Sequence, residues 1–311
     1  MIVSNSFQLQ PVTASADAPP ARRLPRPGVV VSGTLGQMGR IVEVRYRGRL
    51  GNQLFQYAFG RLLAEQLRAT FVAPPIDGFP EARARRPPLF MRRSRPSVTV
   101  KGHWLSQRRR AALRTERHID LFGFFQRVEY YREHRERIAD WFSRPRQAPL
   151  PERSLTIHLR SGLWSDGGKK HPGYPALPIS YYRRILDERP WSAVYLVCER
   201  ADDPIATQLL AIPGVQHEER SYLDDFDFLL ASRNIALSVS SFGWWPAWLS
   251  DAETIFYPLA GIFDPDWVGP KKRDGRIDLA PGGDARYRFV KVVTPTIWRG
   301  DAEDRRRVLS T

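Results

Sequence analysis

The sequence of 311 residues is poor in cysteine, with Cys198 as its single thiol. One thiol excludes an internal disulfide framework and argues against a metal site built from thiolates. We therefore expect a reducing compartment. The chain also lacks a run of about 18 apolar residues, which excludes a transmembrane helix. Its N-terminus lacks the continuous apolar segment of a secretory signal, so we expect a cytoplasmic protein.

Internal repeats are missing as well, since no period of about 20–50 residues is visible. What the chain does contain is typical of a globular protein: 42% hydrophobic and 12% aromatic residues. A length of 311 residues predicts two domains, each with enough apolar residues for a core.

The formal net charge is +15. Such a charge is compatible with nucleic acid, an anionic membrane surface or a phosphorylated small molecule as a partner. The basic runs at 83–86, 92–95 and 108–110 are scattered and do not form one stripe interleaved with aromatic residues. A solvated basic face is the simplest interpretation, and a surface for an anionic partner is the alternative.

The composition divides the chain into three parts. Residues 1–40 are rich in Ala, Pro, Ser and Gly, and we expect them to be disordered, or to lie upstream of a true start near Met38. The proline-rich stretch 143–151 is the expected boundary between an N-terminal domain, 41–150, and a C-terminal domain, 151–311.

The segment Ser154–Gly162 reads as a buried strand, because Leu155 and Ile157 alternate with polar neighbours. It delivers His158 and Arg160 to its carboxyl end and is followed by a polar loop. Open α/β sheets place their ligand sites at this edge. The planar, permanently charged guanidinium of Arg160 suits a phosphate.

Strands alternate with helices along most of the chain, which predicts an α/β fold with covered parallel sheets. Strands are expected at 41–44, 71–73, 154–162, 193–198, 235–239 and 254–257. Helices are expected at 54–63, 128–142, 181–186, 206–210 and 224–231, the third capped by Ser180. The basic, loop-rich region 83–117 is left unassigned.

Three polar segments each follow a predicted strand: 48–53, 158–162 and 240–242. The first belongs to a strand, glycine turn and helix, typical of the opening of a Rossmann-like unit. Gly51 would let a ligand approach the backbone, and Asn52 and Gln53 would offer hydrogen bonds. Alternatively, the turn only needs an unusual backbone conformation.

These segments resemble the motifs of the family-11 glycosyltransferases, the inverting α-1,2-fucosyltransferases, and more distantly the protein O-fucosyltransferases. The family opens with Gly-Gly-Leu-Gly-Asn-Gln-hydrophobic-Phe-Gln-Tyr-Ala, and residues 48–58 match it with Arg49 in place of the second glycine. The family's His-x-Arg-Arg-Gly-Asp aligns with 158–163, where Ser161 and Leu163 replace the second Arg and the Asp. Its Asn-Ser-Ser-Phe-Ser-Trp-Trp aligns with 239–245, and the resemblance spans about 41–260.

The resemblance implies a GT-B-type glycosyltransferase, with two Rossmann-like domains facing across a cleft. The N-terminal domain would be on the acceptor side and the C-terminal domain would bind the GDP-sugar. The implied reaction is an inverting, metal-independent transfer of L-fucose from GDP-fucose to a hydroxyl of a glycan, with an α-1,2 linkage on a surface polysaccharide or oligosaccharide. No cofactor or metal ion is implied. We expect Arg160 and His158 to be catalytic, together with Asp166, which would replace the family's missing aspartate from the loop after the strand. The expected donor-binding residues are Gly51, Asn52, Gln53, His158, Arg160, Gly162, Glu199, Asp225, Ser240, Ser241 and Phe242.

The catalytic base is open at the level of sequence. An inverting transfer needs a carboxylate or histidine near the acceptor hydroxyl, unless the leaving phosphate takes the proton. The candidates are Asp166, His171, Glu199 and Asp225. Two Asp-x-Asp tripeptides, 225–227 and 264–266, spell a metal–diphosphate signature, but this short pattern is common by chance and we expect no metal.

Structural interpretations stand beside the functional ones. His158 could be a strand histidine bonded to backbone, Ser240 could be a helix cap, and Trp244, Trp245 and Trp248 are expected in the core. The expected partners are GDP-fucose, a glycan acceptor and an anionic membrane surface, with peripheral attachment at the inner membrane and no nucleic acid. The alternatives are a protein O-fucosyltransferase, a transferase for another GDP-sugar, an inactive sugar-nucleotide-binding protein, or a basic nucleic-acid binder.

Overall fold

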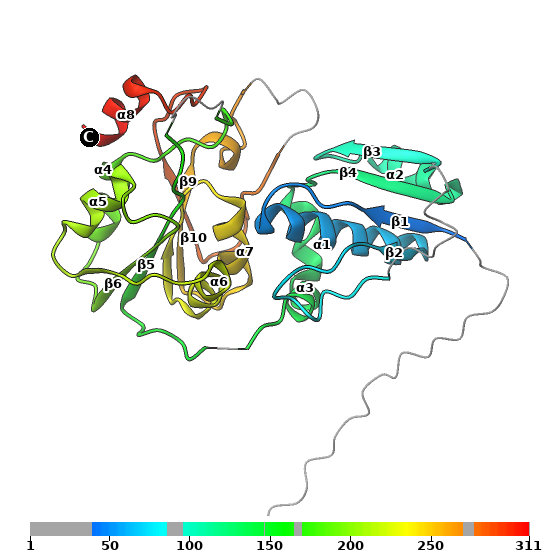
Figure 1. Cartoon of the computed structure of the whole chain (residues 1–311), viewed down its shortest axis with the longest axis horizontal. Helices are drawn as coiled ribbons and strands as arrows, with labels where there is room; N and C mark the ends of the chain where they lie inside the picture. Colours follow the sequence, from blue (N-terminus) through cyan, green and yellow to red (C-terminus); the bar gives the residue numbers. More distant parts are fainter. Residues whose placement is uncertain (1–38, 86–95, 146, 165–169, 270–276, 311) are drawn as a thin grey trace, which may run out of the picture. The chain divides into compact units, whose positions relative to one another are not determined.

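The computed structural model describes residues 39–85, 96–145, 147–164, 170–269 and 277–310. They belong to one unit, Gly39–Thr311, which contains two parallel β-sheets and the helices around them (Figure 1). The predicted α/β class is therefore confirmed. The division into domains at 143–151 stays a prediction, because both sheets share this unit.

The first sheet has four parallel strands in the order β2-β1-β4-β3. They are β1 (Ile41–Val44), β2 (Thr70–Val72), β3 (Val98–Gly102) and β4 (His118–Gly123). The 18-residue helix α1 (Leu50–Leu67) connects β1 to β2 and lies along one face of the sheet (Figure 1). The strands expected at 41–44 and 71–73 are both present, the second shifted by one residue.

Alternating apolar residues attach this sheet to α1. Val42 and Val44 of β1 are buried, as is Leu54 of α1. Gly60 brings the helix close to the sheet, since a Cβ there would fall 2.7 Å from the side chains of both Phe71 and Val44. The tight packing holds the start of α1, and with it the 48–53 turn, in a fixed place at the carboxyl end of β1.

The second sheet has six parallel strands in the order β10-β9-β8-β5-β6-β7. They are β5 (Ser154–Leu159), β6 (Ala193–Cys198), β7 (Val215–His217), β8 (Asn234–Ala236), β9 (Thr254–Leu259) and β10 (Tyr287–Lys291). All six residues of β5 are buried, as expected for a central strand covered on both faces.

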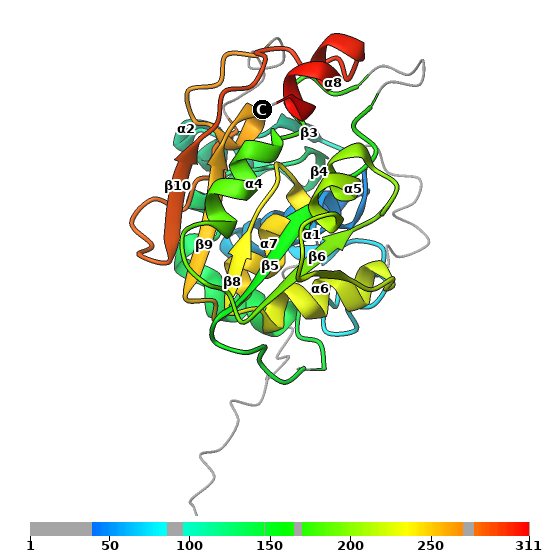
Figure 2. The same cartoon turned by 90° about the vertical axis from the view of Figure 1, so that its left-hand side faces the viewer.

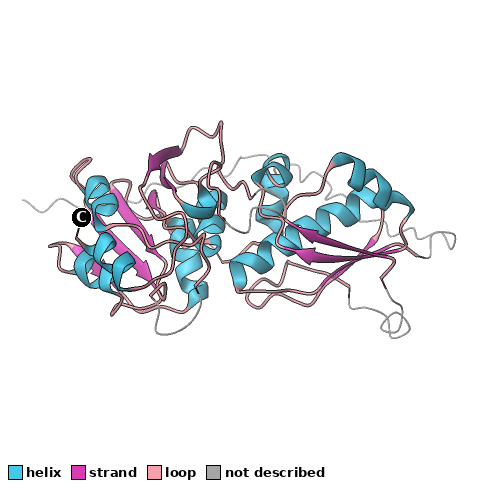
Figure 3. Cartoon of the chain, turned by 90° about the horizontal axis from the view of Figure 1, so that it is seen from above, coloured by secondary structure: helices cyan, strands magenta, loops and turns pink. Residues whose placement is uncertain are grey.

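Helices cover both faces of the second sheet (Figure 3). They are α4 (Ile179–Leu186), α5 (Pro204–Leu210), α6 (Tyr222–Ala231) and α7 (Ser241–Leu249). Helices α4 and α5 lie on one face, and α6 and α7 lie on the other, toward α1 (Figures 1 and 2). This is the doubly wound arrangement that right-handed crossovers between parallel strands produce.

Aromatic side chains join α7 to α1. The Phe55 ring centroid lies 5.0 Å from that of Trp244 and 4.6 Å from that of Trp245. The Trp245 indole donates a hydrogen bond of 3.0 Å to the carbonyl of Gly51. Trp244, Trp245 and Trp248 are all buried, which confirms that they belong to the core. The two sheets are thus linked by aromatic helix–helix packing next to the 48–53 turn.

Two helix predictions need correction. The helix expected at 128–142 is broken into 3-10 turns at Val128–Tyr130 and Arg132–His134, followed by α3 (Arg135–Trp141). The break lies between Tyr131, whose buried hydroxyl donates to the Phe125 carbonyl at 2.6 Å, and His134, whose backbone (φ −121°, ψ 16°) leaves the helical geometry. Helix α4 begins at Ile179, two residues early, and is preceded by Pro178 with no capping side chain, so Ser180 is not its cap.

Several elements were not predicted at all. They are β3, β7, β10, α2 (Gln107–Ala112) and α8 (Ala302–Leu309). Both helices begin with a side-chain cap, Ser106 for α2 and Asp301 for α8, and these caps were readable signals in the sequence. In the part of the chain that is described, no helix combines the length and apolarity needed to cross a membrane.

Candidate functional site

The site is located by the order of strands in the second sheet. From β5 the chain moves outward through β6 to β7, then returns to β8 on the other side of β5. The direction of winding therefore reverses between β5 and β8, and ligands bind at the carboxyl ends of strands at such a switch point. Arg160 directly follows β5, and Ser238 and Ser240 follow β8. The structure brings these three residues, separated by about 80 positions, to one edge.

Arg160 is held by its backbone and its side chain. Its N–H donates to Oγ of Ser238 at 2.9 Å, and its guanidinium lies 4.2 Å from the ring centroid of Tyr174. Burial lowers the pKa of Arg160, although a guanidinium remains charged at neutral pH. None of the ion pairs among the described residues involves Arg160. A half-buried cation that makes no ion pair with the described carboxylates is suited to an anionic ligand.

His158 lies in β5, two residues before Arg160, and is buried. Its Nδ1 is 3.1 Å from Oγ of Ser238, and a Cβ at Gly243 would fall 2.6 Å from the same nitrogen. Burial, followed by the charge of Arg160, lowers the pKa of His158 to about 3. The imidazole is therefore neutral at neutral pH and a weak base. Ser238 Oγ, which also accepts the Arg160 N–H, therefore contacts both residues.

The residues after β8 form the start of α7. Ser240 is the N-cap, and its Oγ accepts the N–H of Phe242 at 3.2 Å. Ser240 and Ser241 are buried, whereas Phe242 is half-buried. The capping interpretation of Ser240 is confirmed, and it agrees with a functional one, since a helix N-terminus at a switch point favours a bound anion.

The glycine turn approaches the same edge from the first sheet. Gly48 has a left-handed φ of 79°, and its carbonyl accepts from Gln53 Nε2 at 3.2 Å. Oδ1 of Asn52 accepts from Gln126 Nε2 at 3.0 Å. The side chains of Asn52 and Gln53 therefore make structural hydrogen bonds in this structure.

A glycine is needed at position 51 for a reason other than the predicted approach of a ligand. A Cβ there would lie 2.4 Å from the carbonyl carbon of Ser241 and 2.5 Å from the nitrogen of Phe242. The missing side chain thus lets α1 touch the first turn of α7, backbone to backbone. Gly162, by contrast, is exposed with a φ of 71°, and its carbonyl accepts from Lys170 at 3.2 Å.

Two carboxylates lie along the same sheet, after β6 and in α6. Glu199 directly follows β6, and its Oε2 is 2.6 Å from Nη1 of Arg49. Asp225 lies in the first turn of α6 and is half-buried, and burial raises its pKa to about 6 against the opposing charges of Arg220 and His217. Asp225 therefore titrates closer to neutral pH than an ordinary aspartate.

The other predicted residues divide into two groups. Asp166 lies outside the described residues, and its predicted role stays a prediction. His171 is described: its Nδ1 accepts from the Gly173 N–H at 3.2 Å, and its ring lies 4.9 Å from that of Tyr174, which in turn contacts Arg160. The sequence analysis did not identify Tyr174 or Ser238 as site residues. Ser238 could have been found, because it lies two positions before the predicted Ser240, and residues with this spacing in an extended chain face the same side.

Both Asp-x-Asp tripeptides have structural roles. Asp227 receives two hydrogen bonds from Arg144, at 2.6 and 2.8 Å. Asp264 pairs with Lys291 at 2.6 Å and accepts the N–H of Asp266 at 3.0 Å. Within the described ranges, no three His, Cys, Asp or Glu side chains gather as ligands for a metal ion.

No protein-family model matches the sequence, and no curated protein matches it. Three solved structures illustrate the partial similarities of fold, each at 12% sequence identity. An arginine-to-lysine variant of Arabidopsis thaliana FUT1 in complex with GDP gives a TM-score of 0.45 over 72% of each chain. Fucosyltransferase NodZ from Bradyrhizobium gives 0.40 over 70% of this chain and 95% of that one. ADP-heptose LPS heptosyltransferase II from E. coli gives 0.42 over 85% and 93%. At TM-scores below 0.5, these similarities assign no function to this chain.

Proposed function

We propose that the chain is a GT-B-type glycosyltransferase that transfers a sugar from a nucleoside diphosphate, with GDP-fucose as the donor and a glycan hydroxyl as the acceptor. The observation that supports it most is the position of Arg160. It stands at the switch point of the second sheet, fixed by Ser238, and is free of the ion pairs among the described residues. The motif resemblance at 48–58 directs the choice toward a GDP-sugar and fucose.

Arg160 would act on the leaving group. Cleavage of the sugar–phosphate bond builds negative charge on the diphosphate and leaves an oxocarbenium-like sugar. A preorganised guanidinium, with the N-terminus of α7 beside it, stabilises that charge more in the transition state than in the ground state. The proposed reaction is metal-independent and inverting, so Arg160 supplies most of this stabilisation.

His158 has a positioning role in this proposal, which departs from the catalytic role that the resemblance implied. A general base works best when its pKa is near the operating pH, and a pKa of about 3 is far below it. His158 acts through Ser238, which orients the backbone of Arg160. Asp225, whose pKa burial raises to about 6, is the described candidate that we propose for the base.

Release of GDP from GDP-fucose by the purified chain tests the transfer. We expect GDP-fucose, with a glycan acceptor, to be consumed in the presence of EDTA, and GDP to bind more tightly than UDP or ADP. Turnover that EDTA abolishes would refute the metal-independent mechanism. Absence of binding to every nucleoside diphosphate would refute the assignment as a whole.

A sugar-nucleotide-binding protein without transferase activity is the second candidate, and the position of Leu163 favours it. Leu163 stands where the resembled motif has an aspartate, and it is buried, with its carbonyl accepting from the Trp298 indole at 3.0 Å. This position offers no acid or base. Tight GDP binding without GDP release, across glycan and peptide acceptors, would select this candidate.

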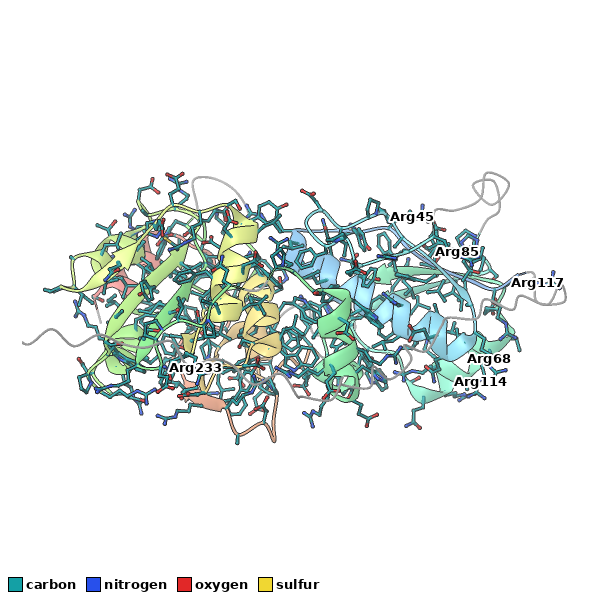
Figure 4. The ribbon with its side chains drawn as sticks, turned by 90° about the horizontal axis from the view of Figure 1, so that it is seen from below. Arg45, Arg68, Arg85, Arg114, Arg117 and Arg233 are labelled. Atoms are coloured by element: carbon teal, nitrogen blue, oxygen red, sulfur yellow. The ribbon has the colours of Figure 1, made fainter. Side chains whose placement is uncertain are left out.

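Peripheral attachment to an anionic membrane is part of the proposal, and the distribution of charge supports it. Residues 41–150 contain 23 Lys and Arg against 10 Asp and Glu, a net of +13, whereas 151–311 contain 21 against 22, a net of −1. Arg68, Arg114 and Arg117 are exposed and lie at the same end of the first sheet (Figure 4). Such a basic surface attracts acidic lipids within a short, salt-dependent range.

Vesicle sedimentation tests this attachment. We expect binding to vesicles that contain phosphatidylglycerol, loss of binding in high salt, and no binding to neutral phosphatidylcholine vesicles. Replacing Arg68, Arg114 and Arg117 together by Gln should weaken the binding. Equal binding to both kinds of vesicle would contradict the electrostatic explanation.

A further inference from the structure

Arg49 extends from the glycine turn of the first sheet to a residue of the second. It occupies the N-cap position of α1, and its Nη1 lies 2.6 Å from Oε2 of Glu199, 150 positions along the chain. Its side chain is 82% exposed. The turn itself is fixed, because Gly51, two residues later, packs on the backbone of Ser241. Arg49 therefore places an exposed cation on a tightly packed turn, beside the first turn of α7.

The strand register places Glu199 beside Arg160. Strands β5 and β6 pair in parallel, with His158 opposite Val197 and Leu159 opposite Cys198. The next positions in the same register are Arg160 and Glu199. Arg49 and Arg160 thus lie near the same carboxylate, and their charges interact. Burial contributes most to the lowered pKa of Arg160; the charge of Arg49 lowers it further, whereas Glu199 raises it.

Lys170 also reaches this edge, but its Nζ donates to the carbonyl of Gly162, and the two described residues that directly follow Arg160 and Glu199 supply no further unpaired cation. Arg200 follows Glu199, but its Nε and Nη2 donate to Asp202 at 2.9 and 2.7 Å. Ser161 follows Arg160 and has only a hydroxyl, which accepts the N–H of Arg200 at 3.3 Å. A departing diphosphate carries more than one negative charge, so a single guanidinium leaves part of it unmatched.

We propose that Arg49 is the second diphosphate-binding cation of the site, and that Glu199 holds it at the edge of the sheet while the site is empty. This inference rests on the proposed nucleotide-sugar function and names a further residue for it. An ion pair between exposed side chains contributes little to stability, so exchanging it for a phosphate costs little. A guanidinium binds phosphate oxygens through two parallel N–H donors. We expect this interaction to be stronger than the exposed ion pair between Arg49 and Glu199.

The inference changes the role of Glu199. A donor-binding Glu199 would contact the ligand, and its loss would weaken GDP binding. A Glu199 that only holds Arg49 competes with the phosphate for the guanidinium, and its negative charge repels the ligand. Glu199→Gln therefore separates the two roles by the sign of its effect on GDP affinity.

Calorimetric titration of the full chain with GDP and with guanosine tests the inference. We expect Arg49→Ala to weaken GDP binding about tenfold or more, and to leave the affinity for guanosine, which has no phosphate, unchanged. We expect Glu199→Gln to bind GDP as tightly as the original chain or several-fold more tightly. Arg288→Ala, which removes another exposed arginine in a long-range ion pair, 2.8 Å from Glu188, is the matched control and should leave both affinities unchanged.

Three outcomes would overturn the inference. Arg49→Ala could bind GDP as the Arg288→Ala control does, or lose affinity for GDP and guanosine equally. Glu199→Gln could reproduce the loss seen in Arg49→Ala, which would mean that the ion pair only maintains the structure. In each case the original chain still binds GDP, and the proposed function stands. If the original chain binds neither GDP nor another nucleoside diphosphate, both proposals fail.

Discussion

The hydroxyl of Ser238 connects Arg160 to His158. Its Oγ accepts the Arg160 N–H at 2.9 Å and lies 3.1 Å from Nδ1 of His158. Ser238 is itself buried, and its N–H donates to the His158 carbonyl at 3.1 Å. One buried side chain thus determines the direction in which the backbone of Arg160 leaves β5.

Ser238→Ala removes this connection. The change leaves the Arg160 N–H and His158 Nδ1 without their partner, and an unpaired buried polar group costs about 1–3 kcal/mol. We expect a lower free energy of unfolding by that amount, and a kcat for GDP release reduced about tenfold, the scale of misplacing a charge-stabilising group. Thermal unfolding and steady-state kinetics check the two effects. Ser238→Thr, which keeps the hydroxyl, should retain more activity than the alanine variant.

Arg160→Lys keeps the charge and loses the planar fork. A lysine ammonium cannot form two parallel hydrogen bonds to a phosphate, and its shorter head cannot stack on Tyr174 in the same way. We expect kcat to fall by about 10² or more, with the unfolding temperature nearly unchanged. Kinetics with GDP-fucose and a thermal unfolding curve check this. A near-normal kcat would remove Arg160 from the mechanism.

The depressed pKa of His158 predicts an acid limb in the pH dependence of stability, that is, a free energy of unfolding that decreases as the pH falls. The unfolded histidine titrates near its ordinary value of 6.5, whereas the folded one has a pKa of about 3. Between these values the unfolded state binds more protons, so stability falls as the pH decreases from about 6.5 toward 3. The expected slope from this group is on the order of 1 kcal/mol per pH unit.

His158→Asn is the matched variant for this limb, because its amide oxygen can accept from Ser238 and does not titrate. Denaturant unfolding at pH 4, 5, 6 and 7 should give a shallower dependence on pH for the variant than for the original chain. Equal slopes for the two proteins would show that His158 is not the source of the acid limb.

The parts of this chain that were predictable share a local cause. The strands 154–159 and 193–198 show in the sequence because buried positions near the centre of the sheet require apolar or β-branched residues, alternating with polar ones in the first strand and consecutive in the second. The place of Arg160 was predictable from the first of these strands, because the residue that follows a strand in the sequence lies at the carboxyl edge of the sheet. The contacts of that arginine do not follow, because Tyr174 and Ser238 reach it through folding of distant segments.

The missed features have long-range causes as well. The pairing of Arg49 with Glu199 spans 150 positions and depends on how α1 packs on α7. Gly51 was interpreted as a ligand-facing glycine because the motif shows only that a side chain is excluded. The identity of the excluding group, the backbone of Ser241, requires the fold. The break in the expected 128–142 helix likewise lies next to Tyr131, whose buried hydroxyl bonds outside that segment.

Asp225→Asn tests the other shifted group, with the opposite sign. The pKa of Asp225 is raised from 3.8 to about 6, mainly by burial. The folded state therefore binds more protons between these values, and stability falls as the pH rises from about 4 to 6. We expect the variant to be more stable than the original chain at pH 7 by on the order of 1 kcal/mol, after allowance for partial exposure, and equal to it near pH 4. Denaturant unfolding at the two pH values checks this; a variant that is less stable at pH 7 would contradict it.

Gly51→Ala tests the contact on which the geometry of the site depends. The new Cβ would stand 2.4–2.5 Å from backbone atoms of Ser241 and Phe242, which cannot rotate away as a side chain would. Either α1 or the first turn of α7 must move, and the hydrogen bond from Trp245 to the Gly51 carbonyl is strained with it. Overpacking of this kind costs about 1–3 kcal/mol. We expect an unfolding temperature lower by several degrees and GDP binding weakened together with it, because Arg49 and the N-terminus of α7 lose their relative position. Gly282→Ala is the control, since a Cβ at Gly282 meets no atom within 4 Å and should change neither quantity. A Gly51→Ala protein that unfolds and binds GDP as the control does would show that the turn and α7 are not held by this contact.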